Sequence, residues 1–395
     1  MTEPAVRIEK VVAEGDGLGR LADGRVVFVE GGLPGELVSI RIVKQSRDYA
    51  RAVVVGVLEA NPERIDPPCP HVSHGCGGCD LQHATVGLQR RIKLDIVRES
   101  LVRIGRQVDP QVVLGPTHSD PFGYRTTIRV ARGDKGQVGF RRRSSHDVVP
   151  VTNCLIAHPG LNAVLERVRV GSEVDEIALR ASNVDDAITW WAEPDADDVS
   201  GLPARGGPES RLVEQVFGRD FVVSAGSFFQ SSPAAAEALV ESVRRALGDP
   251  NTWPEGDVVD AYSGIGLFAA LAVPADRHVL AIESNPWACA DARVNLSDRS
   301  ATVVESRVDD WQPRNCAVVV ADPARDGLRA SGVEVLSNTG AAVIVLVSCD
   351  PASLGRDARL LDAAGYQLDE CEVLDLFPQT HHVEAVSRFV RRERL

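Results

Sequence analysis

Cys349 is the residue whose type and position point most directly to covalent chemistry. It follows seven apolar residues, 341–347, a run typical of a strand buried on both faces of a parallel sheet. Asp350 can cap a following helix, and Pro351 suits the first position of that helix. Ligands of open α/β sheets bind outside the carboxyl ends of the strands, and a helix N-terminus lowers the pKa of a thiol. We therefore predict a nucleophile here, in preference to a buried structural cysteine.

Two carboxylates are predicted to reach the same rim of the sheet. Residues 317–321 read as another buried strand, which ends in Asp322, and the polar turn 375–384 ends in Glu384. Because neighbouring strand ends meet at one edge, Asp322 and Glu384 are expected near Cys349. The alternatives are a helix cap for Asp322 and a surface acid for Glu384.

A glycine-rich turn indicates a nucleotide-like ligand. The expected strand 257–262 runs into Gly264 and Gly266 in the pattern G-x-G-x-x-A, and the next strand, 278–282, ends in Glu283. Close backbone approach and a carboxylate for ribose hydroxyls fit either a dinucleotide or S-adenosylmethionine. A tight turn without ligand is the plain alternative, and a dehydrogenase is the enzymatic one. A dehydrogenase gives no task to Cys349.

Three cysteines indicate a metal site. Cys69, Cys76 and Cys79 have the spacing C-x6-C-x2-C among glycines, and Cys154 is the nearby candidate for a fourth thiolate. In a cytosolic chain such a group favours metal binding over disulfides. Four thiolates suit zinc or an iron-sulfur cluster equally, which leaves zinc as the default. Three further possible ligands, more simply read as solvated histidines, are His71, His74 and His83.

The charge of the chain is unevenly distributed. The formal net charge is −13, yet residues 125–143 carry seven basic residues against one acidic residue. Residues 90–106 carry six bases against two acids, and residues 171–200 carry nine acids against one base. A polyanion such as RNA could bind the basic stripe while the acidic side faces away. A solvated charged face is the alternative.

The elements that position these residues divide into three parts. Residues 5–59 alternate with period two around Asp23-Gly24, as in a small OB-like β-barrel, and 61–68 reads as a linker. A helix with basic residues on its polar face is expected at 86–105, followed by strands at 126–132, 137–143, 176–179 and 187–191 and a disordered-looking loop at 193–210. From residue 227 helices and strands alternate, beginning with a helix from Pro233, which predicts a parallel sheet.

These motifs, in this order, resemble the RNA uracil-C5 methyltransferases that make 5-methyluridine. The resemblance covers nearly the whole chain and rests on the barrel, the four cysteines and the motifs SFFQSS (227–232), DAYSGIG (260–266), DPAR (322–325), SCDP (348–351) and DLFPQTHHVE (375–384). It implies an α/β fold: an N-terminal TRAM-type OB-like barrel (1–60), a small α+β iron-sulfur domain (61–226) and a Rossmann-like methyltransferase domain (227–395). The helix at 86–105 is expected to pack on the last of these.

The resemblance also implies a role for each site residue. Cys349 would be the nucleophile, Glu384 the base that removes a proton, and Asp322 the group that holds uracil. Residues implied to bind S-adenosylmethionine are Gln230, Tyr262, Gly264, Gly266, Glu283 and Asp322. Cys69, Cys76, Cys79 and Cys154 would hold a four-iron four-sulfur cluster. Two residues depart from the family pattern: Asp350 replaces an Asn, and Leu267 replaces a commonly polar residue.

The sequence thus predicts an S-adenosylmethionine-dependent enzyme that methylates uracil C5 in structured RNA through a covalent cysteine adduct. Ribosomal 23S RNA is favoured over transfer RNA, and a monomer is expected. The alternative is an RNA-binding iron-sulfur protein without catalysis; a radical methylthiotransferase would need C-x3-C-x2-C, which is absent. Without a signal sequence or an apolar membrane span in the sequence, a cytoplasmic protein with no membrane partner is expected.

Overall fold

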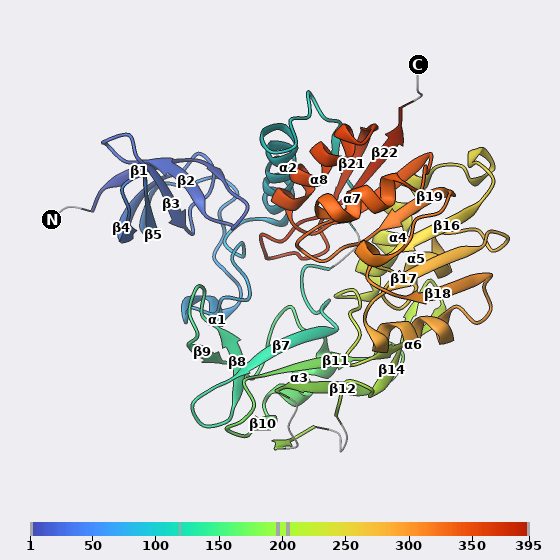
Figure 1. Ribbon diagram of the computed structural model, residues 1–395. Coiled ribbons are helices and arrows are strands. Elements are labelled where there is room, and N and C mark those ends of the chain that lie inside the picture. Colours follow the sequence, from blue (N-terminus) through green and yellow to red (C-terminus); the bar gives the residue numbers. More distant parts are fainter. Residues whose placement is uncertain (1–2, 118–119, 195–197, 203–205, 393–395) are drawn as a thin grey trace.

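The computed structural model describes residues 3–117, 120–194, 198–202 and 206–392. Three bodies are visible in Figure 1: a barrel at the N-terminus, a smaller sheet at the bottom of the view, and a large sheet with helices on both faces. The predicted fold class, a Rossmann-like domain joined to an OB-like barrel and a small α+β part, is confirmed. No helix in the described ranges is both long and apolar enough to cross a membrane.

The N-terminal barrel is closed by five strands in the order β1-β2-β3-β5-β4. Its core is made by alternate residues, such as Val6 and Ile8 on β1 and Val27 and Val29 on β3, because successive side chains of a strand point to opposite faces. The predicted hairpin at Asp23-Gly24 joins β2 to β3. The strands are β1 (Ala5–Val11), β2 (Gly17–Arg20), β3 (Val26–Glu30), β4 (Leu37–Gln45) and β5 (Tyr49–Glu59).

The middle of the chain forms a five-stranded sheet in the order β12-β11-β7-β8-β9, packed on α3 (Pro159–Leu165). Its strands are β7 (Thr127–Arg132), β8 (Val138–Arg141), β9 (Val148–Pro150), β11 (Glu176–Ala181) and β12 (Ile188–Glu193), which confirms the four strands predicted here. This part of the chain also contains the short α1 (Pro70–Ser73) and a separate two-stranded sheet of β10 (Arg169–Val170) and β13 (Val199–Ser200). The loop predicted at 193–210 falls partly outside the described residues.

The large sheet has eight strands in the order β18-β17-β16-β19-β20-β22-β21-β6. Neighbours from β18 to β20 run parallel, whereas β22 is antiparallel to both β20 and β21. Its strands are β6 (Val112–Leu114), β16 (Asp257–Ala261), β17 (Val279–Glu283), β18 (Ala301–Glu305), β19 (Cys316–Ala321), β20 (Val343–Ser348), β21 (Tyr366–Leu374) and β22 (Glu384–Arg391).

Helices cover both faces of this sheet, and each face has its own apolar core. One core contains α4 (Pro233–Leu247), α5 (Leu267–Leu271), α6 (Pro286–Asn295) and the hairpin of β14 (Arg211–Val216) and β15 (Arg219–Ser224). The other contains α2 (Val86–Arg103), α7 (Arg329–Ser337) and α8 (Pro351–Ala363). Two 3-10 turns, η1 (Pro250–Thr252) and η2 (Val308–Asp310), lie between these elements.

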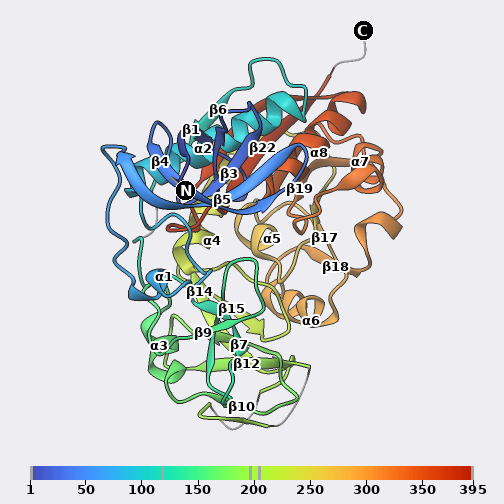
Figure 2. The same cartoon turned by 90° about the vertical axis from the view of Figure 1, so that its left-hand side faces the viewer.

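Two elements that precede the middle sheet in sequence pack with the large sheet. Figure 2 shows α2 lying along α8, and Ser100 of α2 contributes a hydrogen bond to the Pro351 carbonyl. The strand β6 pairs with β21 at the sheet edge. The predicted contact of this helix with the catalytic part is therefore present, although Lys93 on it is fully buried and not on an exposed polar face. A division of the chain at residues 60 and 226 remains a proposal.

Candidate active site

Cys349 lies where the sequence places it, between a buried strand and a helix. All six residues of β20 are buried, and two residues, Cys349 and Asp350, separate the end of that strand from the start of α8. Asp350 caps the helix, because its Oδ1 accepts a hydrogen bond from Ser353 N at 2.7 Å, and Pro351 takes the first helical position. The replacement of Asn by Asp at this position therefore preserves a capping acceptor. The thiol is half-buried at the carboxyl edge of the sheet.

The strand register brings two carboxylates to the same edge. In the antiparallel pair of β20 and β22, Ser348 lies opposite Ala385, so Cys349 and Glu384 are the next residues along each strand. On the other side of β20, β19 ends at Ala321, and Asp322 follows immediately. The structure thus brings Cys349, Glu384 and Asp322 together, although they are distant in sequence.

Burial raises the pKa of all three groups, and neighbouring carboxyl groups add to the shift for Cys349 and Glu384. Burial, followed by the neighbouring Asp322, holds the pKa of Glu384 well above its ordinary value, and burial raises the pKa of Asp322 to about 7. Burial, Glu384 and Asp322 raise the pKa of the Cys349 thiol to about 12, and Arg325 opposes this shift. The expectation that the helix N-terminus lowers this thiol pKa is wrong, because desolvation and two nearby carboxyl groups outweigh the helix end. In the free enzyme the thiol is therefore protonated.

The glycine-rich turn after β16 lies beside a crevice at the same edge, and its first residue, Tyr262, lines that crevice. Gly264 and Gly266 have positive φ angles of 53° and 89°, and Gly264 N donates to Glu283 Oε2 at 2.9 Å. Tyr262 also has a positive φ, 60°, in this turn. The crevice has a volume of about 260 Å³ and is lined by Tyr262, Glu283 and the loops after β18 and β19. A ligand that carries a nucleoside requires a turn that its phosphate or sugar can approach closely and a carboxylate for the ribose hydroxyls; the turn at 262–266 and Glu283 have these properties.

Sequence reasoning missed one wall of this crevice. Ser306, Arg307 and Asp309 follow β18 and line it. A sequence signal for this wall exists in the short run Ala301–Glu305, which forms β18 and pairs with β17 as the next parallel strand. Polar residues directly after such a strand reach the same edge as Glu283. Leu267, by contrast, is buried in the apolar core, so this departure from the family pattern lies in the packing of α5.

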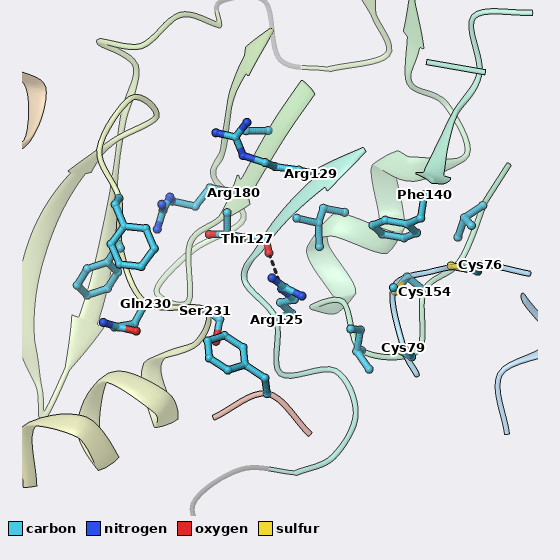
Figure 3. Close-up of a pocket in the computed structure, with 18 of the residues that line it drawn as sticks. Cys76, Cys79, Arg125, Thr127, Arg129, Phe140, Cys154, Arg180, Gln230 and Ser231 are labelled. Atoms are coloured by element: carbon cyan, nitrogen blue, oxygen red, sulfur yellow. Dashed lines mark hydrogen bonds between the residues drawn. The ribbon is translucent and has the colours of Figure 1, made fainter. Parts of the chain in front are cut away.

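Gln230 lies in a separate, larger cavity of about 670 Å³ between the large sheet and the middle sheet. Figure 3 shows Gln230 and Ser231 toward one end of this cavity, Arg125 between, and Cys76, Cys79 and Cys154 at the other end. The loop carrying Gln230 is fixed from both sides, since Ser227 Oγ donates to Asp291 at 2.7 Å and Thr126 N donates to the Ser231 carbonyl at 2.8 Å. Arg325 also lines the cavity, near Cys349.

The two cavities approach each other at Asn285. Glu283 Oε1 accepts from Asn285 N at 2.7 Å, and Asn285 Nδ2 donates to the Gly226 carbonyl at 3.0 Å. Asn285 lines the larger cavity, whereas Glu283 lines the crevice. Among the residues predicted to bind the cofactor, Gln230 lines the larger cavity, whereas Tyr262 and Glu283 line the crevice.

The four predicted metal ligands all line the larger cavity. Burial and neighbouring thiols raise the pKa of Cys76, Cys79 and Cys154, for Cys79 to about 12. The backbone wraps tightly around them: a Cβ added at Gly77 would lie 2.8 Å from the Arg141 carbonyl oxygen. Within the described ranges, no three His, Cys, Asp or Glu side chains converge as the ligands of a metal ion would.

Comparisons with known proteins agree with this architecture. The TRAM domain family matches residues 3–55, and the tRNA (uracil-5-)-methyltransferase family matches residues 305–392. An uncharacterized RNA methyltransferase of Streptomyces avermitilis is 35% identical, with 98% of this chain and 97% of that protein covered. The 23S rRNA (uracil(1939)-C(5))-methyltransferase RlmD of Methylococcus capsulatus is 32% identical, with 98% and 97% covered.

A solved structure shares the fold over the whole length. Pyrococcus abyssi tRNA (uracil-54, C5)-methyltransferase, in complex with S-adenosyl-L-homocysteine, superimposes with a TM-score of 0.73 at 22% identity, covering 98% of this chain and all of that one. The relatives above 30% identity show that the chain belongs to the RNA uracil-C5 methyltransferases, with an N-terminal TRAM domain.

Proposed function

We propose that this enzyme methylates a uridine of 23S ribosomal RNA through a covalent bond between Cys349 and uracil C6. The observation that carries the covalent route is the convergence of Cys349, Glu384 and Asp322 at one buried edge. Ribosomal RNA is favoured because the RlmD relative of Methylococcus capsulatus matches 98% of the chain.

The reaction explains why these residue types are needed. Uracil C5 is a weak nucleophile. Once the Cys349 thiol has given up its proton to solvent, addition of the thiolate to C6 forms a carbon-sulfur bond and moves the ring electrons toward C5 and the carbonyl oxygen. S-adenosylmethionine supplies the methyl group for C5. Glu384, as a carboxylate, then removes the C5 proton, and the electrons of that bond restore the C5–C6 double bond and expel the thiolate. The target base must leave its stack to reach this edge.

Asp322 can bind uracil in either protonation state. As a carboxylate it accepts a hydrogen bond from N3–H, and as a neutral acid it donates one to a carbonyl oxygen that gains charge during the addition. Its pKa of about 7 makes both forms accessible near neutral pH. The group can therefore position the ring before the addition and stabilise charge during it.

The order of steps gives a direct test. Glu384→Gln retains size and hydrogen bonding but is a far poorer proton acceptor, so the reaction should stop after methyl transfer. RNA bound covalently to Cys349 should accumulate as a denaturant-resistant band labelled from methyl-labelled cofactor. Cys349→Ala is the matched control: it should bind RNA and give no band. Normal turnover by Glu384→Gln would show that another group is the base, and a band in Cys349→Ala would refute the nucleophile.

The RNA target is tested separately in cells. Loss of 5-methyluridine from one position of 23S RNA on deletion of the gene, restored by the wild type and not by Cys349→Ala, is the expected result. Loss of 5-methyluridine from transfer RNA alone would instead identify transfer RNA as the substrate. No change in either RNA would favour a binding protein without catalysis.

The cysteines are proposed to hold a four-iron four-sulfur cluster. Four thiols that line one cavity, lie beside tightly wrapped glycine backbone and are not bonded to one another have the ligand chemistry of such a cluster, although they do not converge as metal ligands in this structure. Cys69, Cys76, Cys79 and Cys154 would hold it, and its role would be structural. Protein purified without oxygen should be brown and contain iron and sulfide, both lost in Cys79→Ser. Colourless protein containing zinc would contradict this proposal.

A further inference from the structure

The loop that leads into Glu384, residues 375–382, is held in place mainly by one segment that is distant in sequence, residues 80–93. Lys93 Nζ donates to Asp375 Oδ1 at 2.6 Å and to the Phe377 carbonyl at 2.9 Å. Gln89 Oε1 accepts from Gln379 N at 2.7 Å. Within the described chain, the hydrogen bonds that reach this loop from elsewhere come from residues 80–93 and from Tyr124. Residues 80–93 directly follow Cys79.

Of these contacts with the loop, the one that Asp80 makes with His381 is the nearest to Glu384 in sequence. Its Oδ1 accepts from the main-chain N–H of His381 at 2.8 Å, and its Oδ2 contacts Nδ1 of the same histidine. The Asp80 side chain is only 12% exposed. His381 lies three residues before Glu384, so this pair ties the cysteine segment to the end of the loop where β22 begins.

The N-terminal barrel also reaches the pair of Asp80 and His381, and we call this meeting point the junction. Gly15, in the turn between β1 and β2, has a φ of +83°, and a Cβ there would lie 3.0 Å from Asp80 Oδ2 and 3.1 Å from His381 Cβ. Arg143 fixes this turn, with 3.0 Å to Asp16 Oδ1 and 2.5 Å to the Glu14 carbonyl. Barrel, cysteine segment and loop thus meet at the pair of Asp80 and His381.

We propose that Asp80 is a positioning residue for proton abstraction: it fixes the loop so that Glu384 faces C5 of the methylated base. The proposal rests on the role of Glu384 proposed above. A base acts only within hydrogen-bond reach of the proton it removes, and a misplacement of about 1 Å can cost about 100-fold in rate. Because the addition of Cys349 and the methyl transfer come earlier, loss of Asp80 should affect the last step selectively.

Two variants of Asp80 separate positioning from general damage. Asp80→Ala removes both contacts with His381, whereas Asp80→Asn keeps an acceptor for the His381 N–H. RNA from cells lacking the gene serves as substrate, with methyl-labelled S-adenosylmethionine. For Asp80→Ala we expect turnover to fall by about 10- to 100-fold while labelled covalent adduct accumulates. Asp80→Asn should restore most of the turnover and accumulate little adduct. RNA affinity and the iron content of each variant should stay near the wild-type values.

A pair of glycine variants tests the junction without altering Asp80. Gly15→Ala places a methyl group against both Asp80 and His381, whereas Gly35→Ala, at a φ of +82° in the same barrel, meets nothing within 4 Å. Both variants bear a similar backbone strain. Adduct should accumulate in Gly15→Ala and not in Gly35→Ala. This comparison also decides the question if Asp80→Ala fails to fold.

The outcomes distinguish this inference from the proposed function. If Glu384→Gln accumulates adduct but Asp80→Ala turns over within twofold of wild type, Asp80 does not position the base. Loss of turnover in Asp80→Ala without adduct, or equal behaviour of the two glycine variants, also refutes the inference. Absence of adduct in Glu384→Gln would instead refute the proposed base itself.

Discussion

Proton distribution decides how the residues of the active edge can act. Burial raises the pKa of Asp260 to about 7, and the nearby Asp322 and Glu283 add to this shift, although a hydrogen bond from Ala269 N opposes it. Asp322 has a pKa of about 7 as well, and Cys349 holds its proton more firmly. The free enzyme therefore carries exchangeable protons on Asp260, Asp322 and Cys349. The proposed reaction takes place at this edge, and it must remove one proton from the Cys349 thiol and one from uracil C5.

Asp260 provides a test of this proton distribution through stability. Its folded pKa of about 7 exceeds the ordinary value of 3.8, so the folded state binds more protons and loses stability as pH rises between these values. Asp260→Asn keeps an acceptor for Ala269 N but cannot ionise. We expect its unfolding free energy, relative to wild type, to increase by about 2–3 kcal/mol between about pH 5 and pH 8. Chemical denaturation across this range measures the difference, and a pH-independent value would contradict the argument.

Single residues also show how far the sequence could predict the site. The strand-end positions of Cys349 and Asp322 follow from runs of apolar residues, which report burial directly. The sign of the Cys349 pKa shift could not be predicted, because it depends on burial of the thiol in the folded site and then on Glu384, which approaches only through the pairing of β20 with β22. Asp80 carried no signal at all, since its partner His381 lies 301 residues away.

Among the elements, α2 does more than its sequence pattern indicated. Its buried face includes the polar Gln89 and Lys93, which contact the loop before Glu384, whereas an amphipathic reading places basic residues on the solvent side. The three-residue β6 is too short for a period to be recognised, and it is defined by its pairing with β21. Local periodicity predicted the existence of most elements, but their partners depend on contacts that are distant in sequence.

The buried ion pair between Lys93 and Asp375 makes α2 testable as a support. Lys93 is fully buried and the Asp375 side chain is 6% exposed, with 2.6 Å between Nζ and Oδ1. Lys93→Met should lower the unfolding free energy by about 3–5 kcal/mol, because it leaves a buried carboxylate without a partner. Lys93→Met combined with Asp375→Leu should recover much of this loss. Thermal and denaturant unfolding measure both variants, and equal losses would show that the pair is not coupled.

At the scale of the whole molecule, the acidic and basic segments are not segregated as expected. Strands β7 and β11 are neighbours, with Arg129 opposite Ala178, and Arg129 forms ion pairs with Glu176 at 3.1 Å and Glu193 at 3.2 Å. The prediction that the acidic segment faces away from the basic stripe is therefore wrong for these residues. Net charge along the sequence cannot reveal this, because cross-strand pairing neutralises part of the stripe.

Arg142 is the residue of the stripe that should contribute most to RNA binding. Within the described residues its exposed guanidinium has no hydrogen bond or ion pair with another side chain, whereas Arg143 pairs with Asp16 and Arg141 contacts His146. Its guanidinium lies over Gly75, beside the cysteine segment. A cation without a partner in the protein can neutralise a phosphate and release a counterion without first breaking an ion pair within the protein.

The prediction compares Arg142→Ala with Arg129→Ala, in which an arginine already neutralised by two glutamates is removed. RNA affinity is measured between about 50 and 200 mM salt, with RNA from cells lacking the gene. Arg142→Ala should weaken binding and reduce the slope of log affinity against log salt by about 0.7–0.9, the contribution of one phosphate contact. Arg129→Ala should leave the slope nearly unchanged. Equal slopes for Arg142→Ala and wild type would mean that this part of the stripe is only a solvated face, and RNA binding would then have to depend on other surfaces of the enzyme, such as the barrel.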